Sequence, residues 1–236
     1  QAQDLTMVRF DPATAKGSET RREIYEAALT LFRERGFDAT TMQQVAERAG
    51  VAKGAAYYYF PSKEALIQSY YEEVQQRQEE LCAPVFAAKK DLKERLAVAL
   101  MSKLELAKDR KLLGLIFRYT GEPAHPLSCL GPATSATRQR SMAIFAEALK
   151  TEKLPRDLEQ LLPVALWALQ MGLLVMLFHD TSTGQKKTRR LAAGALELTL
   201  QLLKLAKLPV LKPVRTRVTT LLREADLLSE GTGIRE

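Results

Sequence analysis

Positive charge, phenol hydroxyls and very small side chains are concentrated in one short stretch of this chain. Lys53 brings an ammonium group, and Tyr57 and Tyr58 bring two hydroxyls. Groups of these kinds donate hydrogen bonds to phosphate oxygens. Gly54 and Ala55 add almost no side-chain bulk to the same surface, so a partner can approach the backbone closely. This pattern favours contact with a nucleic acid, made by a helix that enters a major groove.

A preceding short helix and a tight turn must position these side chains. Thr41 and Gln44 have the spacing of a capping box, which predicts a helix that starts at Met42. Gly50 is expected to end this helix. A helix this short is not stable alone, so it must pack against its neighbours.

The second helix is expected to begin at Ala52 or Lys53 and to end at Tyr59. Pro61 sets this end, because a proline disfavours helical geometry at the residue before it. Ser62 is then expected to cap a long helix that ends before Pro84. Lys63, in its first turn, adds another charge that attracts phosphate.

An earlier helix supplies the rest of a small core. It is expected to start at Thr20, which has Glu23 as its capping partner, and to end at Gly36. Its buried face carries apolar side chains at helical spacing. Phe37 is expected to fold back onto the helix after the glycine.

The motif resembles the DNA-binding domain of the tetracycline-repressor (TetR) family over residues 20–66. The residues that carry the resemblance are Phe37, Thr40, Thr41, Val45, Ala46, Ala49, Gly50, Val51, Lys53, Gly54, Tyr57, Tyr58, Phe60, Ser62, Lys63, Glu64 and Leu66. The resemblance implies that Thr41 clamps a phosphate and that Gln43 reads a base. It implies base contacts for Lys53 and Gly54. It also implies contacts to the groove and phosphates for Tyr57, Tyr58 and Lys63.

Four positions depart from the family pattern and leave the base readout open. Ala52 stands where a capping serine is common, and Tyr59 replaces a frequent histidine. Ala55 and Ala56 replace a frequent Thr-Leu pair. The alternative is a helical hairpin with buried tyrosines and no DNA. It would have to bury three consecutive phenols, more than the inner face of one helix accepts.

The overall charge does not support the nucleic-acid interpretation by itself. Of the net +7, residues 182–236 supply +6, from 11 basic and 5 acidic side chains. Residues 1–63 carry 9 basic and 8 acidic side chains. Cys82 and Cys129 lack the spacing of a zinc site or a disulfide framework, which fits a reducing cytoplasm.

The remainder of the chain predicts an all-α fold, because no segment alternates with a period of two residues. Helices are expected over residues 91–107, 109–119 and 135–150, with a Pro/Gly loop at 121–134. A further amphipathic helix is expected over residues 214–228. We expect a flexible arm at 1–19, the DNA-binding domain at 20–66, an effector-binding and dimerisation domain at 67–208 and a helical extension at 209–236.

One uncharged stretch is as long as a minimal membrane span. It begins at Leu161 and ends at Phe178. Gln170 lies at its centre, and it lacks an aromatic belt and a positive flank. We therefore expect it to be buried on every side and no membrane to be involved. Together with the amphipathic stretch from Gln185 to Leu205, it predicts a four-helix interface between two copies of the chain, as the resemblance also implies.

The resemblance further implies a small-molecule effector, and the apolar composition suggests that it is largely apolar. The side chains expected to line its pocket are Phe117, Tyr119, Phe145, Trp167 and Met171. Core packing is the alternative role for each of them.

Catalytic signatures are missing from the sequence. His125 and His179 are the only histidines, and neither belongs to a hydrolase or metal motif. We expect no catalytic residue, metal or cofactor. The favoured function is a ligand-responsive repressor that binds a palindromic operator as a homodimer. Two alternatives stay open: a DNA-bound protein that acts through a protein partner, as in nucleoid occlusion, and a helical enzyme or carrier with a vestigial hairpin.

Overall fold

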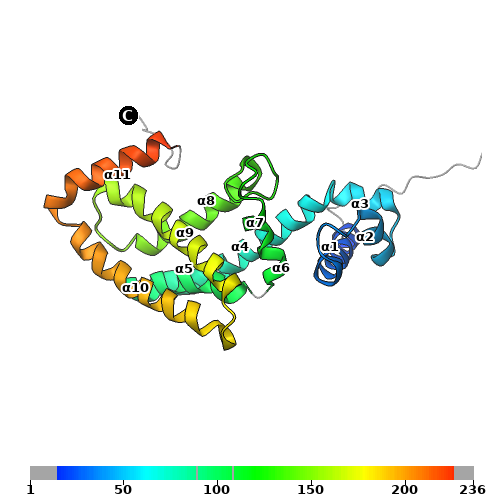
Figure 1. Cartoon of the computed structure of the whole chain (residues 1–236), viewed down its shortest axis with the longest axis horizontal. Coiled ribbons are helices and arrows are strands. Elements are labelled where there is room, and N and C mark those ends of the chain that lie inside the picture. Colours follow the sequence, from blue (N-terminus) through cyan, green and yellow to red (C-terminus); the bar gives the residue numbers. More distant parts are fainter. Residues whose placement is uncertain (1–14, 89, 108, 226–236) are drawn as a thin grey trace, which may run out of the picture. The chain divides into compact units, whose positions relative to one another are not determined.

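The computed structural model describes residues 15–88, 90–107 and 109–225 (Figure 1). The described residues form α-helices, short 3-10 turns and loops, and none of them lies in a strand, which confirms the all-α prediction. They divide into two compact units. The first unit comprises the chain up to Tyr71 together with Lys111–Gly131, and the second comprises Glu72–Arg110 and the chain from Pro132 onward.

The first unit is built around three helices and the beginning of a fourth. They are α1 (Ala15–Arg35), α2 (Met42–Arg48), α3 (Lys53–Tyr59) and α4 (Lys63–Ala87). Each contributes side chains to one apolar core, because each has one face free of charge. The core side chains from this part of the unit that are at most 1% exposed are Ile24, Ala28, Phe32, Val45, Ala46, Ala56, Phe60, Leu66 and Ile67.

Gly36 ends α1 as the sequence predicts. Its φ of +88° lies in the left-handed region, which costs glycine little. Its amide donates a hydrogen bond of 3.0 Å to the carbonyl of Phe32. The chain then folds back, and the ring of Phe37 packs 5.3 Å from that of Phe32.

The predicted start of α1 at Thr20 is wrong, because the helix already includes Ala15. Thr20 is buried inside the helix, and so is Gly17 one turn earlier. Burial of these two residues shows that the first turns pack against the unit, and packing overrides a local capping signal. Residues 1–14, which make up most of the expected flexible arm, lie outside the described residues.

The single helix predicted over residues 109–119 is two helices, α6 (Arg110–Leu113) and α7 (Leu115–Arg118). Gly114 separates them, and its low helix propensity favours a break. The carbonyl of Gly114 accepts hydrogen bonds of 3.1 Å from the amides of both Phe117 and Arg118. The second turn therefore starts anew at the glycine.

Five further helices lie among the described residues of the second unit (Figure 1). They are α5 (Leu92–Leu106), α8 (Ser135–Leu149), α9 (Arg156–His179), α10 (Lys186–Ala206) and α11 (Lys212–Glu224), with 3-10 turns at Pro132–Thr134, Thr183–Gln185 and Pro209–Leu211. Helices α5, α8 and α9 pack on one another, α10 packs on α5 and α9, and α11 packs on α9. The helices predicted over 91–107 and 135–150 are confirmed. Helix α11 starts two residues earlier than predicted, because Pro213 fits the first turn of a helix, and it ends at Glu224 and not at residue 228.

The predicted end of α4 before Pro84 is wrong, since the helix continues to Ala87. Arg95 of α5, which is only 2% exposed, stabilises this end. Its guanidinium donates to the carbonyl of Phe86 at 2.9 Å and to the carbonyl of Ala148 in α8 at 2.9 Å. One buried cation thus holds the carboxyl ends of two helices, where the helix dipole favours positive charge.

Helix α9 is long and apolar enough to cross a membrane by length and composition, but a core helix of a soluble protein passes the same test. The expectation that it is buried on every side is wrong for a single chain, because 39% of its most apolar window is buried and Met176 is 50% exposed. Helix α10 likewise exposes four leucines at helical spacing: Leu191, Leu198, Leu202 and Leu205. Both helices therefore present uncovered apolar surface.

Candidate nucleic-acid interface

Helix α2 begins with the predicted capping box. The side chain of Thr41 accepts a hydrogen bond of 3.2 Å from the amide of Gln44, and the side chain of Gln44 accepts one of 2.9 Å from the amide of Thr41. Thr41 is exposed, and its hydroxyl proton can still be donated to a phosphate. Gln43 is also exposed, and its amide nitrogen donates to Glu47 at 2.8 Å.

A tight turn carries the chain from α2 to α3. Gly50 adopts a left-handed φ of +68°, and the amide of Val51 returns to the carbonyl of Ala46 at 3.0 Å. Ala52 precedes α3 without a side-chain cap, so the amides of the first turn lack a side-chain partner there. This geometry is a helix-turn-helix.

Helix α3 is anchored by one face and exposes the other. Ala56 is fully buried, whereas Tyr57 is 44% exposed and Tyr58 is 59% exposed. The ammonium of Lys53 lies 6.0 Å from the centre of the Tyr57 ring. The predicted cation and two hydroxyls therefore share one exposed surface, with Ala55 half-buried beside them.

Gly54 stands in the middle of this surface. A Cβ placed on it would meet no atom of the described residues within 4 Å, and its φ is not in the left-handed region. The fold therefore does not require glycine here. An interior glycine costs a helix roughly 0.5–1 kcal/mol relative to alanine. A glycine here adds no side-chain bulk, so a partner can approach the helix backbone closely.

Lys63 has a structural contact that sequence reasoning missed. Its ammonium donates to the carbonyl of Phe37 at 2.8 Å and lies 4.6 Å from the centre of that ring. An ammonium has three protons, so it can hold this carbonyl and a phosphate together.

Two further cations fix helices of the first unit to one another. Arg48 of α2 forms a two-pronged ion pair with Glu34 of α1, at 2.8 and 3.0 Å. Arg21 of α1 lies 4.7 Å from the ring centre of Phe60, at the end of α3. No local sequence signal predicts these pairs, because their partners are 14 or more residues away.

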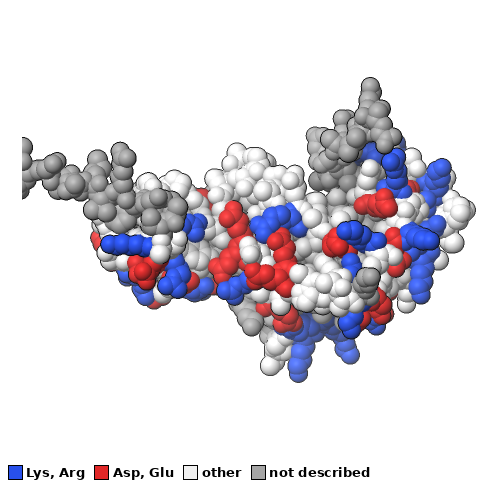
Figure 2. Space-filling view, turned by 180° about the vertical axis from the view of Figure 1, so that it is seen from behind, with Lys and Arg blue, Asp and Glu red and all other residues white. Residues whose placement is uncertain are grey.

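Charge on the molecular surface is mixed in sign. Figure 2 shows lysine and arginine side chains interspersed with acidic ones over the face drawn, without one continuous basic field. Residues 1–63 are nearly neutral as a set. Net charge therefore does not account for nucleic-acid binding, which the sequence assigns to a few groups on α2, α3 and the start of α4.

The five residues predicted to line an effector pocket lie in both units. Phe117 and Tyr119 belong to the first unit, where the Tyr119 ring stacks on His125 with centres 3.6 Å apart. Phe145 on α8 and Trp167 on α9 are buried in the second unit, and Met171 is half-buried on α9. Whether they converge on one ligand stays a prediction.

Comparison with known proteins agrees with this geometry. Residues 24–70 match the model of bacterial regulatory proteins of the tetR family, and residues 95–221 match a tetracyclin repressor-like C-terminal domain. The HTH-type transcriptional regulator RutR of Escherichia coli O157:H7 is 33% identical over 156 residues, which cover 64% of this chain and 72% of RutR.

Solved structures show the same fold. FadR of Thermus thermophilus, a repressor solved with lauroyl-CoA, is 25% identical with a TM-score of 0.53, covering 78% of this chain and 92% of FadR. The SmeT–triclosan complex is 22% identical with a TM-score of 0.60, covering 78% of this chain and 91% of SmeT. The family assignment rests on two matched family models, which together span both units. It also rests on a relative that this chain covers over most of its length. The chain belongs to the TetR family of bacterial transcriptional regulators.

Proposed function

We propose that the chain is a cytoplasmic, ligand-responsive repressor that binds a palindromic operator as a homodimer. Helix α3 enters the major groove, with Lys53 and Gly54 at base edges and Tyr57 and Tyr58 on the groove and phosphates. Thr41 and Lys63 hold the DNA backbone on either side, and Gln43 and Ala55 complete the contact surface. The observation that carries this proposal is Gly54. It is an exposed glycine within α3, and the fold does not require a glycine at this position.

Replacing this glycine tests the proposal, because stability and binding should change in opposite directions. Gly54→Ala should raise the free energy of unfolding by roughly 0.5–1 kcal/mol, since alanine favours the helix. The added methyl group should weaken binding to the operator about tenfold or more, because it occupies space that the base edges need. Urea unfolding and fluorescence anisotropy at one fixed salt concentration measure the two effects.

A second variant of the same helix is the matched control. Ala52→Ser supplies the missing cap of α3 and should also stabilise the chain, by roughly 0.5–2 kcal/mol. It adds no atom at position 54, so operator binding should be kept. If Gly54→Ala binds the operator as tightly as the unchanged chain, α3 does not approach DNA in the proposed way.

The dimer is proposed to form through residues 161–178 of α9 and 185–205 of α10. The four exposed leucines of α10 and the exposed side of α9 support this, because such surface is normally covered in a stable assembly. Symmetric pairing places two copies of α3 on half-sites about 34 Å apart, one turn of DNA.

The effector is proposed to be a small, largely apolar molecule held by Phe117, Tyr119, Phe145, Trp167 and Met171. Lauroyl-CoA in FadR and triclosan in SmeT support this class, since both carry large apolar parts. By linkage, an effector that weakens operator binding 5- to 150-fold must itself bind 5- to 150-fold more weakly in the presence of operator. Trp167 emission, titrated with lauroyl-CoA and with triclosan in the presence and absence of operator, measures this. Equal affinities would exclude that compound as an effector.

A further inference from the structure

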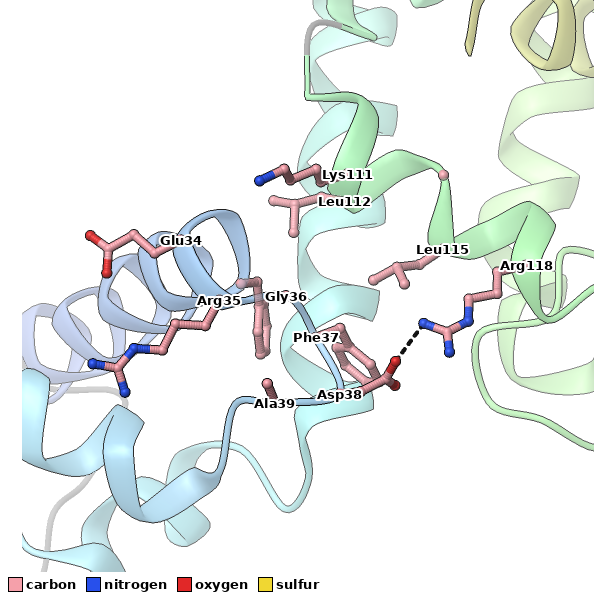
Figure 3. A pocket seen from close by; sticks show the side chains of 12 residues that line it. Glu34, Arg35, Gly36, Phe37, Asp38, Ala39, Lys111, Leu112, Leu115 and Arg118 are labelled. Atoms are coloured by element: carbon pink, nitrogen blue, oxygen red, sulfur yellow. Dashed lines mark ion pairs between the residues drawn. The ribbon is translucent and has the colours of Figure 1, made fainter. Parts of the chain in front are cut away.

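The first unit contains a cavity of about 620 Å³ that none of the proposed DNA or effector residues lines (Figure 3). One wall is the end of α1 and the turn after it, with Phe32 and residues 34–39. The other wall comes from α6, α7 and the glycine between them, with Lys111, Leu112, Gly114, Leu115 and Arg118. Its volume falls within the range of about 300–1,000 Å³ that small-molecule sites occupy.

The inner wall of the cavity is apolar. Phe37 projects into it from the turn after α1, and Leu112 and Leu115 face it from α6 and α7 (Figure 3). All three side chains are at most 7% exposed, so the core of the unit holds them in place. Such a wall accepts the hydrocarbon or aromatic body of a ligand.

The charged residues around the cavity leave positive charge unopposed. The carboxylate of Glu34 is held by Arg48, which lies outside the cavity, and that of Asp38 is held by Arg118 at 2.7 Å. The Arg118 hydrogen bond keeps the pKa of Asp38 below its ordinary value, so this pair stays ionised. Both acidic groups on the cavity wall are therefore already engaged.

Two cations have donors left over. Lys111 extends from α6 toward α1, and its ammonium donates to the carbonyl of Arg33 at 2.7 Å (Figure 3). Two of its three protons are not used by that bond. The guanidinium of Arg35, on the α1 side, points away from Leu112 and Leu115 in Figure 3. It forms no hydrogen bond or ion pair with any residue in the described parts of the chain, so this exposed side chain can turn toward a ligand.

We propose that this cavity binds a small amphipathic anion, with its apolar body against Phe37, Leu112 and Leu115 and its acidic group held by Arg35 and Lys111. A cationic ligand would have to displace Arg48 or Arg118 from its carboxylate. A neutral ligand would leave the donors of Arg35 and Lys111 unused. The site is separate from the proposed effector residues, none of which lines it.

The position of the cavity gives such a ligand access to the DNA-binding helices. The wall formed by residues 36–39 leads directly into Thr41, the cap of α2. A ligand that shifts this turn also shifts the start of the helix-turn-helix. Ligand binding can nevertheless be measured without an operator, because none of the residues that line the cavity is a proposed DNA contact.

The test uses 8-anilinonaphthalene-1-sulfonate, which joins an aromatic body to one sulfonate, and N-phenyl-1-naphthylamine, the same body without the charge. Fluorescence titration of the unchanged chain should show a binding site for the sulfonate. The double variant Arg35→Gln/Lys111→Gln should lose this site or bind the sulfonate there at least about tenfold more weakly. The uncharged probe should not distinguish this variant from the unchanged chain. Arg22→Gln, an exposed arginine of α1 that does not line the cavity, should leave the binding of both probes unchanged.

A third variant blocks the space instead of removing charge. Ala39→Trp, at the exposed rim, should abolish the same site for both probes. Melting temperatures show whether each variant is folded. The proposal would be overturned if Arg35→Gln/Lys111→Gln and Ala39→Trp both bound the sulfonate with unchanged stoichiometry and affinity. It would leave the proposed repressor function untouched, because no DNA is present.

Discussion

The ammonium group of Lys63 lies 2.8 Å from the carbonyl oxygen of Phe37, 26 residues earlier in the chain. This hydrogen bond joins the first turn of α4 to the turn that follows α1. The same ammonium lies 4.6 Å above the Phe37 ring, so a hydrogen bond and a cation–π contact act at one point. A residue that the sequence assigns to phosphate binding therefore also fixes the relative positions of two helices.

Replacing Lys63 with methionine should lower both stability and DNA affinity. A hydrogen bond from a charged group contributes about 1.5–3 kcal/mol, and the half-exposed position of Lys63 favours the lower end of that range. We expect the free energy of unfolding, measured in urea, to fall by roughly 1–2 kcal/mol. Lys53→Met, which removes the same charge from an exposed site, should change it by less than about 0.5 kcal/mol. Equal stabilities of the two variants would show that the Phe37 contact contributes nothing.

Local signals predict much of the first unit. Thr41 and Gln44 form the expected capping box, and Gly36 and Gly50 end their helices because each adopts a left-handed φ. These features depend on residues at most four positions apart. The exposed surface of α3 could be predicted for the same reason, since helical spacing decides which side chains share a face.

Contacts between distant residues could not be predicted in this way. Helix α4 continues past Pro84, because Arg95 of α5 bonds to the last turn of α4. No sequence pattern near Pro84 indicates that Arg95 lies there. The cavity beside Phe37 depends on α6 and α7, more than 70 residues further along the chain. Only the three-dimensional fold brings such groups together.

Lys53 should contribute to the sequence specificity of DNA binding, whereas Lys63 should contribute to the affinity for DNA of any sequence. If Lys53 bonds to a base edge, Lys53→Ala should cost about 1–3 kcal/mol at the operator and less on random DNA. If Lys63 holds a phosphate, Lys63→Ala should weaken both alike and lower the salt slope by about one. Anisotropy titrations over a range of salt concentrations separate the two. Lys153→Ala, which removes one exposed charge from the second unit, controls for net charge. An equal loss on both DNAs for Lys53→Ala would exclude its reading of bases.

The stability of the second unit should depend on pH through Lys103. Burial lowers the pKa of this lysine to about 7, and its ammonium donates to Gln75 of α4 at 2.7 Å and to Ser141 of α8 at 2.9 Å. Glu79, whose carboxylate is held by Arg140, acts in the opposite direction, and the Arg140 charge adds to the lowering. Cys82 also faces this cluster.

The sign of the effect follows from proton binding. Between about pH 7 and the ordinary lysine pKa near 10, the unfolded chain keeps a proton that the folded chain has lost, so stability rises with pH. The slope is at most about 1.4 kcal/mol per pH unit. Lys103→Met should remove this slope in urea unfolding measured from pH 6.5 to 9.5, while Lys90→Met, an exposed lysine of the same unit, should retain it. The same pH dependence in Lys103→Met and the unchanged chain would exclude Lys103 as its source.

Dimerisation should fail when a charge is placed on the exposed leucines of α10. Leu198 is 54% exposed in the single chain, so Leu198→Glu can be accommodated by a monomer, but in the proposed interface it would bury an unpaired carboxylate at a cost of several kcal/mol. Leu173 of α9 is a poorer site for this test, because it is 3% exposed and a charge there would disrupt the fold of the protomer itself. Sedimentation equilibrium should show a monomer for Leu198→Glu and a dimer for Lys204→Glu, an exposed position on the same helix that lies off the leucine face. A dimer of unchanged strength in Leu198→Glu would place the interface elsewhere.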